Sequence, residues 1–188
     1  MVRVALFCSG KGSHLDTVQR MINYGIDLEP VFFFSDNTDA DCYDKAMDMW
    51  PDIEARSMSP FMCSSRKEFD EEVREMMDPY NIELILFLGY MRVVTPTFLK
   101  GAPPIINIHP SLLPAFKGKD AIQQALDAGV EIIGATAHYV DEELDGGPII
   151  TQEAMGLQDE DFDIVKHNVF ILEQRALIRA IQKHLGLI

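Results

Sequence analysis

IINIHPSLLPAFKG, residues 105–118, passes from an apolar strand pattern into a proline-bounded loop. The apolar residues around Asn107 predict a buried strand, which Pro110 ends directly after His109. Because alternate side chains of a strand point to the same side, Asn107 and His109 should leave it together. The sequence thus places an amide and a titratable ring at the C-terminal end of a strand, the edge at which open α/β sheets bind ligands.

A carboxylate follows a second strand pattern, residues 131–140. Asp145 precedes Gly146, Gly147 and Pro148, a turn-forming sequence that can return the carboxylate towards His109. Taken singly, a polar residue at a strand end is more commonly solvated, and Asp-Gly-Gly-Pro is more commonly only a turn. The combination of amide, imidazole and carboxylate is more specific, because these groups together suit acyl-transfer chemistry.

A glycine-rich turn near the N-terminus predicts an anion site. Residues 2–8 read as a buried strand, residues 9–14 as the turn SGKGSH, and residues 15–22 as an amphipathic helix. In this arrangement free backbone N–H groups and the positive end of the helix dipole point outward, where a phosphate can bind. The spacing is not that of a dinucleotide-binding G-x-G-x-x-G fingerprint, and a tight turn without a ligand is the alternative.

The composition restricts the class of protein. A length of 188 residues suits one domain with its own core, and the net charge of −14 argues against nucleic acid as a partner, because no basic face is expected. The three cysteines lack metal-ligand spacing and are compatible with a reducing cytosol. Neither a signal peptide nor a membrane-spanning run is recognisable. We therefore expect a cytoplasmic monomer or homodimer that acts on small molecules, away from membranes.

Strand and helix patterns alternate along the chain without internal repeats. This alternation predicts an α/β fold, doubly wound around a mostly parallel sheet, in a single domain that spans residues 1–188. The short connection around Asp145 favours antiparallel pairing near the C-terminus. Ser65 and Glu68 have the spacing of a capping box, and Asp120 can cap a helix through Ala128. Further strands are expected at residues 28–34, 53–57, 82–88 and 148–152, and helices at residues 39–50 and 161–185. The second of these helices is amphipathic, with Phe162 expected on its buried stripe.

The chain resembles the folate-dependent formyltransferases. The likeness rests on Asn107-x-His109, the following Pro-Ser-Leu-Leu-Pro and Asp145, and it is strong from Gly89 to Glu153. Within this family it is greatest to the members that formylate phosphoribosylglycinamide in de novo purine biosynthesis. The resemblance implies a Rossmann-like formyltransferase fold, 10-formyltetrahydrofolate as co-substrate and no metal. It also implies a phosphate-binding half, about residues 1–100, and a folate and catalytic half, about residues 101–188.

The resemblance further implies roles for individual residues. Catalysis falls to Asn107, His109 and Asp145, and Glu173 approaches the amine side of the acceptor substrate. His14 stands where the family usually has asparagine, and Asn168 and Gln174 also depart from the common pattern. The implied phosphate-binding residues are Gly12, Ser13 and His14, and the implied folate-binding residues are Arg66, Met91, Arg92, Val93, Val94 and Asn107.

In the mechanism that these residues predict, an amine attacks the formyl carbon and a tetrahedral oxyanion forms. Asn107 and a protonated His109 donate hydrogen bonds to that oxygen, and such donors contribute about 3–4 kcal/mol each in acyl transfer. Asp145 favours the imidazolium by proximity. No covalent nucleophile is required, so Ser111 is interpreted as structural, and so is His138, which lacks partners at metal-ligand spacing.

Three other functions remain open at the level of sequence. One is a formyltetrahydrofolate hydrolase, which residues 133–139 also resemble, although such enzymes tend to have histidine where Pro110 stands. Another is a formyltransferase that acts on an amino sugar nucleotide. The third is a folate-binding regulatory protein without turnover, for which the departures at His14, Asn168 and Gln174 leave room.

Overall fold

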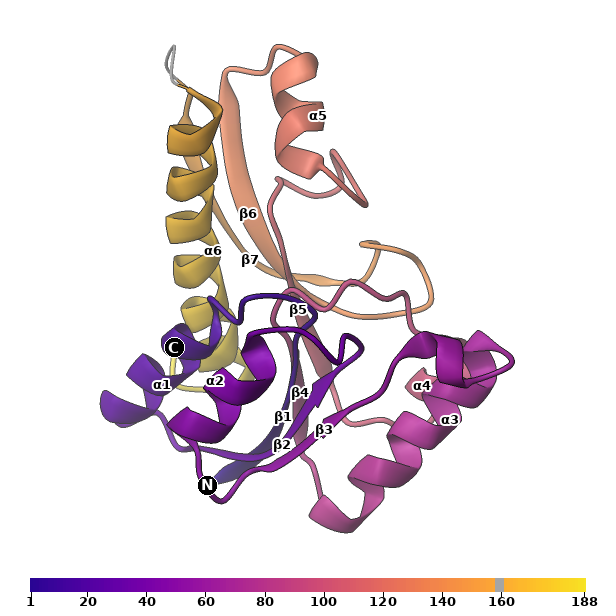
Figure 1. Ribbon diagram of the computed structural model, residues 1–188. Coiled ribbons are helices and arrows are strands. Elements are labelled where there is room, and N and C mark those ends of the chain that lie inside the picture. Colours follow the sequence, from indigo (N-terminus) through magenta and orange to yellow (C-terminus); the bar gives the residue numbers. More distant parts are fainter. Residues whose placement is uncertain (158–160) are drawn as a thin grey trace. The chain divides into compact units, whose positions relative to one another are not determined.

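Four parallel strands form the sheet of the first of two units, Met1–Ile105. Their order is β3 (Glu54–Ser57), β2 (Leu28–Ser35), β1 (Val2–Phe7) and β4 (Leu84–Phe87). A computed structural model describes residues 1–157 and 161–188 (Figure 1). Beyond β4, the Ile85 N–H donates to the Pro104 carbonyl at 2.9 Å, so this strand lies beside the lead-in to β5.

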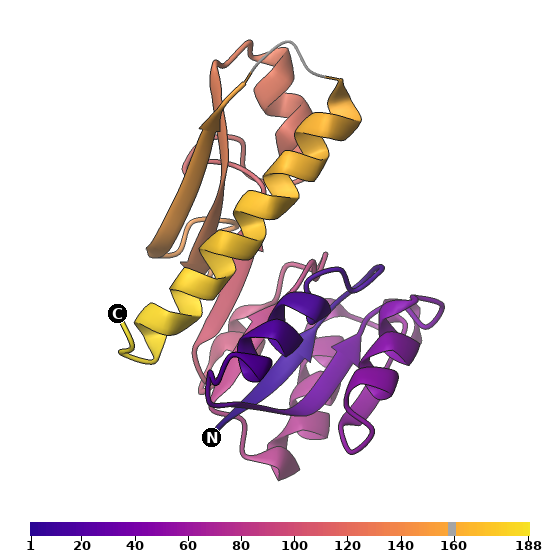
Figure 2. The ribbon, with the colours of Figure 1, turned by 90° about the vertical axis from the view of Figure 1, so that its left-hand side faces the viewer.

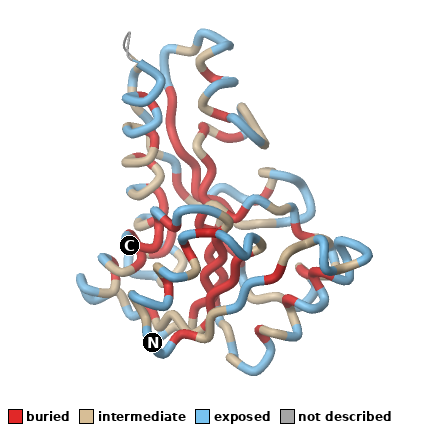
Figure 3. Tube along the Cα trace, viewed as in Figure 1, coloured by how far each residue is buried: buried red, intermediate tan, exposed pale blue. Residues whose placement is uncertain are grey.

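The first unit is stabilised by burial of its central strands. Residues 4–7, 32–34 and 84–87 are almost inaccessible to solvent, as continuous apolar parallel strands covered on both faces should be (Figure 3). The Phe7 ring packs against Phe34, Phe87 and Tyr90, with centroids 5.2–5.4 Å away. Tyr90 directly follows Gly89, where the chain leaves the sheet, so this aromatic cluster anchors the loop at the carboxyl ends of β1 and β4.

Helices connect the strands of this unit. The Ser65 hydroxyl accepts the Glu68 N–H at 3.1 Å, which confirms the predicted N-terminal cap. The reciprocal contact of the box differs, because the Glu68 carboxylate binds the N–H of Ser64 at 2.7 Å and not that of Ser65. The helical segments are α1 (Leu15–Asn23), α2 (Cys42–Met49), η1 (Pro60–Met62), α3 (Arg66–Met77), η2 (Asp78–Tyr80) and α4 (Pro96–Leu99).

The second unit, Ile106–Ile188, contains antiparallel strands, as the short connection around Asp145 predicted. Strand β6 (Ile132–Tyr139) pairs on one side with β5 (Ile105–His109) and on the other with β7 (Ile149–Gly156). Helix α6 (Phe162–His184) runs along β6 and β7 (Figure 2), and α5 (Ala121–Asp127) follows the loop after β5. The predicted α/β class, with parallel strands and antiparallel ones near the C-terminus, is confirmed.

Three local predictions are wrong in detail. Strand β7 ends at Gly156 and not at residue 152, because it pairs with β6 along its whole length. Asp120 makes no side-chain cap; its backbone is left-handed (φ 55°), and α5 ends at Asp127. Phe162 was expected on the buried stripe of α6, but it is 43% exposed, and the buried stripe begins at Val165. None of the described helices is long and apolar enough to cross a membrane.

Candidate active site

The antiparallel pairing of β5 with β6 sets out the polar groups of the site. The register places Asn107 opposite His138, and His109 opposite Thr136. Side chains directly opposite one another in such a pair lie within contact distance. Asn107 and His109, the expected neighbours, therefore share one face of β5 with Thr136 and His138 of β6. From the sequence, His138 was interpreted as structural.

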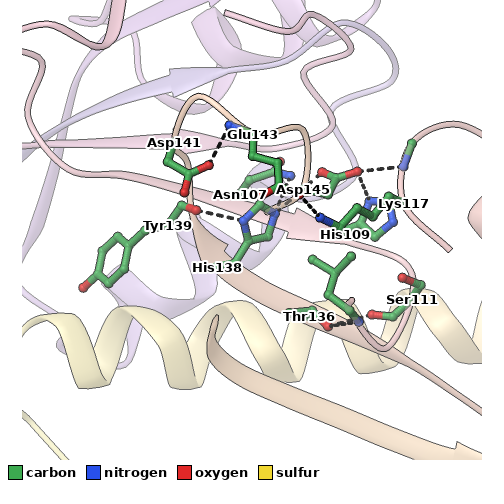
Figure 4. Close-up of polar contacts among 12 residues, drawn as sticks. Asn107, His109, Ser111, Lys117, Thr136, His138, Tyr139, Asp141, Glu143 and Asp145 are labelled. Atoms are coloured by element: carbon green, nitrogen blue, oxygen red, sulfur yellow. Dashed lines mark hydrogen bonds and ion pairs between the residues drawn. The ribbon is translucent and has the colours of Figure 1, made fainter. Parts of the chain in front are cut away.

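Asp145 completes the cluster from the connection between β6 and β7 (Figure 4). Its Oδ2 atom lies 3.5 Å from Nδ1 of His109, and its Oδ1 atom lies 3.7 Å from Nε2 of His138. Both carboxylate and His109 ring are almost buried, with side chains 8% and 7% exposed. The Gly118 N–H donates to Oδ2 at 2.8 Å and fixes the carboxylate from the opposite loop. The predicted convergence of Asp145 on His109 is present.

The turn that carries Asp145 depends on a glycine. A Cβ atom at Gly147 would lie 2.0 Å from the Tyr139 carbonyl oxygen, so the backbone passes there too closely for any side chain. The Tyr139 N–H in turn donates to the Pro148 carbonyl at 2.9 Å. Asp145 itself has a left-handed backbone (φ 48°), a conformation that aspartate tolerates better than most residues. The backbone of this turn therefore determines the position of the Asp145 carboxylate.

His109 has an acceptor at each ring nitrogen. Besides Asp145 at Nδ1, the Phe116 carbonyl oxygen lies 2.9 Å from Nε2. A carbonyl can only accept, so Nε2 carries a proton, and Nδ1 can donate to the carboxylate when the ring holds both protons. The arrangement suits a ring that acts as a hydrogen-bond donor.

The loop that supplies Phe116 is held by a buried network. The Thr136 hydroxyl donates to the Ser111 carbonyl at 2.7 Å and accepts the Leu113 N–H at 3.1 Å. Gln152 on β7 donates to the Leu113 carbonyl at 2.9 Å. The Ser111 hydroxyl donates to the Ala115 carbonyl at 2.6 Å, in keeping with its predicted structural role. The loop conformation, and with it the acceptor for His109, is thus set by residues of β6 and β7 and by a hydrogen bond within the loop.

His138 is the residue of this cluster that the sequence reasoning missed. Its ring is 2% exposed, and burial lowers its pKa below the ordinary histidine value. Its Nε2 atom lies 3.1 Å from Nδ2 of Asn107, and its Nδ1 atom lies 2.8 Å from the Tyr139 carbonyl oxygen. The feature that identifies His138 as part of the cluster is the antiparallel register of β5 and β6, which pairs it with Asn107. Among the described residues, no three histidine, cysteine or acidic side chains are grouped so that they could hold a metal.

In the first unit, the glycine turn has the tight geometry expected of it. Gly12 has a φ of +68°, and a Cβ atom there would lie 2.8 Å from Leu15 Cδ1 and 2.9 Å from Cys42 Cβ. His14 is buried at the start of α1, and Ser13 is exposed beside it. The three implied phosphate-binding residues therefore lie together between β1 and α1, and their role stays a prediction.

The implied folate loop, residues 91–94, is tied to the same turn. The Met91 N–H donates to the Ser9 hydroxyl at 2.9 Å, and that hydroxyl donates to the Asp36 carboxylate. The Arg92 guanidinium stacks over the Phe69 ring at 4.5 Å, while Met91 is 72% exposed. The implied folate residues of this loop, Met91, Arg92, Val93 and Val94, follow β4, whereas Arg66 begins α3.

Glu173 lies half-buried on α6, in the same unit as Asn107, His109 and Asp145. Apart from Arg66 and Glu173, the predicted site residues lie in two groups. One group, with His138 added, surrounds the end of β5. The other surrounds the carboxyl ends of β1 and β4, where Ser9 connects the phosphate turn with the folate loop.

An α/β fold in which an amide, an imidazole and a carboxylate converge at a strand end is the arrangement that the resemblance to formyltransferases implies. The chain belongs to the formyl transferase family, whose model matches residues 2–181.

It is 35% identical over 190 residues to the phosphoribosylglycinamide formyltransferase of Bacillus subtilis, with 100% of this chain and 96% of that protein covered. It is 35% identical over 184 residues to the trifunctional purine biosynthetic protein adenosine-3 of Gallus gallus, matching 96% of this chain but only 18% of that protein.

Solved structures show the same fold. The phosphoribosylglycinamide formyltransferase from Bacillus halodurans has a TM-score of 0.91 at 34% identity, covering 97% of this chain and 95% of that chain. The glycinamide ribonucleotide transformylase 1 from Geobacillus kaustophilus also has a TM-score of 0.91, at 33% identity, covering 99% of this chain and 100% of that one. The predicted Rossmann-like formyltransferase fold is confirmed.

Proposed function

We propose that this enzyme transfers the formyl group of 10-formyltetrahydrofolate to the primary amine of phosphoribosylglycinamide, a step of de novo purine biosynthesis. The observation that carries the proposal is the contact of Asp145 with His109, at 3.5 Å, next to the amide of Asn107. Support for the acceptor comes from relatives named phosphoribosylglycinamide formyltransferase, which match 97% to 100% of this chain.

In the proposed reaction the acceptor amine attacks the formyl carbon, and the carbonyl oxygen becomes an oxyanion. Asn107 donates an amide N–H to this oxygen, and the protonated His109 ring adds a second hydrogen bond and a positive charge. Asp145, fixed by the Gly118 N–H, orients the ring and stabilises its charge.

Collapse of the intermediate breaks the bond between the formyl carbon and the folate nitrogen. The attacking amine loses a proton, and the leaving nitrogen gains one, so the overall exchange needs no external acid. The Asp145 carboxylate contacts His109 and can take part in this proton movement, with water as a relay.

The remaining assignments are proposals of the same kind. Gly12, Ser13 and His14 bind the phosphate of the acceptor, and Glu173 approaches its amine. Arg66 and the Met91 loop bind the folate. The proposed enzyme works in the cytoplasm as a monomer or homodimer on small molecules, and the net charge of −14 supports the exclusion of nucleic acid.

The test supplies 10-formyltetrahydrofolate with phosphoribosylglycinamide, with an amino sugar nucleotide, or with no amine. Folate absorbance and released formate are followed in each mixture. We expect deformylation of the folate only with phosphoribosylglycinamide and without free formate. Formate in the amine-free mixture would favour a hydrolase, turnover with the sugar nucleotide would change the acceptor, and no turnover with any would contradict an enzymatic role.

A further inference from the structure

We propose that His138 is a positioning residue of the formyl-transfer site, which acts by fixing the orientation of the Asn107 amide. The inference rests on the proposed function, because it concerns the donor that Asn107 offers to the oxyanion. It starts from two contacts of one buried ring, to the Tyr139 carbonyl at 2.8 Å and to the Asn107 amide nitrogen at 3.1 Å.

The first contact sets the tautomer of the ring. The Tyr139 carbonyl can only accept a hydrogen bond, so Nδ1 of His138 carries the proton. In the neutral ring Nε2 then holds a lone pair and accepts. An amide nitrogen has no lone pair to offer, so the bond from Asn107 Nδ2 to His138 Nε2 has a single possible direction.

This direction determines which end of the Asn107 amide is free to act. With one N–H given to His138, the second N–H remains available for the developing oxyanion. A flipped amide would set its oxygen against the Nε2 lone pair, losing one hydrogen bond and adding repulsion between two acceptors. The amide nitrogen and oxygen are nearly equal in size, so packing alone cannot make this choice; the histidine lone pair can.

The charge state of His138 matters for the same reason. Burial lowers its pKa, while the Tyr139 carbonyl and the carboxylates of Asp145 and Asp141 oppose this shift and His109 adds to it. A proton on Nε2 would repel the Asn107 N–H and favour the flipped amide. It would also compete for Asp145, whose Oδ1 lies 3.7 Å away. The neutral ring thus keeps Asn107 as a donor and leaves Asp145 to His109.

The kinetic test is a double-mutant cycle on the formyl-transfer rate. His138→Leu removes the acceptor, and we expect kcat to fall between about tenfold and 100-fold, with KM values changed less than about threefold, because a transition-state donor is lost. In an Asn107→Ala background the same substitution should have little further effect. His138→Gln, whose carbonyl can accept from Asn107, should recover much of the activity.

Additive losses in the cycle, or a folded His138→Leu variant with nearly normal kcat, would overturn the inference. Should His138→Leu fail to fold, the same cycle is run with His138→Phe, whose ring is of similar shape but offers no lone pair to Asn107, and a nearly normal kcat in that variant would contradict a set orientation. Wild-type protein without turnover on phosphoribosylglycinamide would instead overturn the proposed function.

A second measurement does not depend on activity. In protein labelled with ¹⁵N-histidine, the His138 resonance, assigned by its loss in His138→Gln, should show a neutral ring protonated at Nδ1 near pH 7. A ring protonated at Nε2, or an imidazolium, would overturn the positioning role whatever the reaction proves to be.

Discussion

The two oxygens of Asp145 face different partners. Oδ2 accepts the Gly118 N–H at 2.8 Å and faces His109, while Oδ1 faces His138. An asparagine at this position could keep the bond to Gly118, since its amide oxygen also accepts, but it would carry no charge. The residue thus combines a structural contact with an electrostatic one, and a substitution can separate the two.

We predict that Asp145→Asn lowers kcat by about 100-fold or more, because the His109 ring loses the charge that stabilises its protonated form. The melting temperature should change little, since the contact with Gly118 can persist. Steady-state kinetics and thermal unfolding measure the two effects separately. Glu143→Gln in the same connection, on an exposed side chain bonded to Lys117, is the matched control and should retain activity. Near-normal kcat in Asp145→Asn would contradict the electrostatic role.

Asn107 offers the only side-chain amide at the end of β5 in the part of the chain that the structure describes. We predict that Asn107→Ala lowers kcat by about 100- to 1,000-fold, the usual cost of losing one oxyanion donor. Single-turnover rates distinguish this loss from weaker folate binding. Gln123→Ala on the exposed face of α5 removes an amide of similar chemistry and should have no effect. A loss confined to the KM for folate would assign Asn107 to binding alone.

At the level of elements, the glycine turn depends on close packing between β1, α1 and α2. Gly12→Ala combines an unfavourable left-handed backbone with a Cβ atom under 3 Å from Leu15 and Cys42. We predict an affinity for phosphoribosylglycinamide at least about tenfold weaker, and a lower melting temperature. Gly10→Ala is the matched control, because a Cβ atom there meets nothing within 4 Å. Calorimetric titration measures the affinity of each variant for phosphoribosylglycinamide. If Gly12→Ala bound it as tightly as Gly10→Ala does, the assignment of this turn to the phosphate would be contradicted.

Ser9 connects that turn with the loop after β4. Ser9→Ala leaves the Met91 N–H without its acceptor and the Asp36 carboxylate without its donor. We predict that the KM values for both substrates rise about five- to 30-fold, corresponding to the loss of one or two hydrogen bonds, while kcat falls less. Ser57→Ala, on an exposed strand end, serves as the control. A rise in only one KM would show that the two loops act independently.

The elements themselves were largely predictable from sequence, because apolar periodicity and turn residues are local signals. The strand and helix patterns matched the observed elements to within a few residues, apart from the longer β7. The errors arose where local chemistry competes with tertiary contacts. Asp120 stands at the N-cap position of α5, but its backbone is left-handed and its side chain makes no cap hydrogen bond. His138 was interpreted as structural, and its contact with Asn107 could not be predicted, because the two residues are 31 positions apart and only strand register brings them together.

At the level of the whole molecule, the predicted family and fold are confirmed along nearly the entire chain. The sequence could indicate these because the motif around Asn107 and Asp145 combines chemistry with spacing. It could not indicate how many polar groups share the buried site, since burial of a histidine depends on the packing of complete elements. The folded chain is therefore less stable at acidic pH, because its buried histidine rings stay uncharged.

Two histidine rings, the buried His138 and the half-buried His184, predict how global stability depends on pH. Burial lowers both pKa values in the folded state, whereas the unfolded chain has ordinary values of about 6.5. The unfolded state therefore binds more protons as the pH falls through that range, and the free energy of unfolding decreases. Their stabilising contribution is fully present above about pH 7 and is lost on acidification below the ordinary histidine pKa. We expect a lower melting temperature at pH 5.5 than at pH 7.5.

Substitution separates the two histidines from the acidic residues that also titrate at low pH. His184→Gln, which can still accept a hydrogen bond from the Tyr139 hydroxyl, should reduce the loss of stability between pH 7.5 and 5.5. His167→Gln, on the exposed face of the same helix, is the matched control and should leave that loss unchanged. An identical pH dependence in His184→Gln and wild-type protein would contradict the prediction for His184. His138→Gln should likewise reduce the loss of stability between pH 7.5 and 5.5, and it should recover activity relative to His138→Leu. This variant therefore tests whether one buried ring both orients the Asn107 amide and makes the fold sensitive to acid.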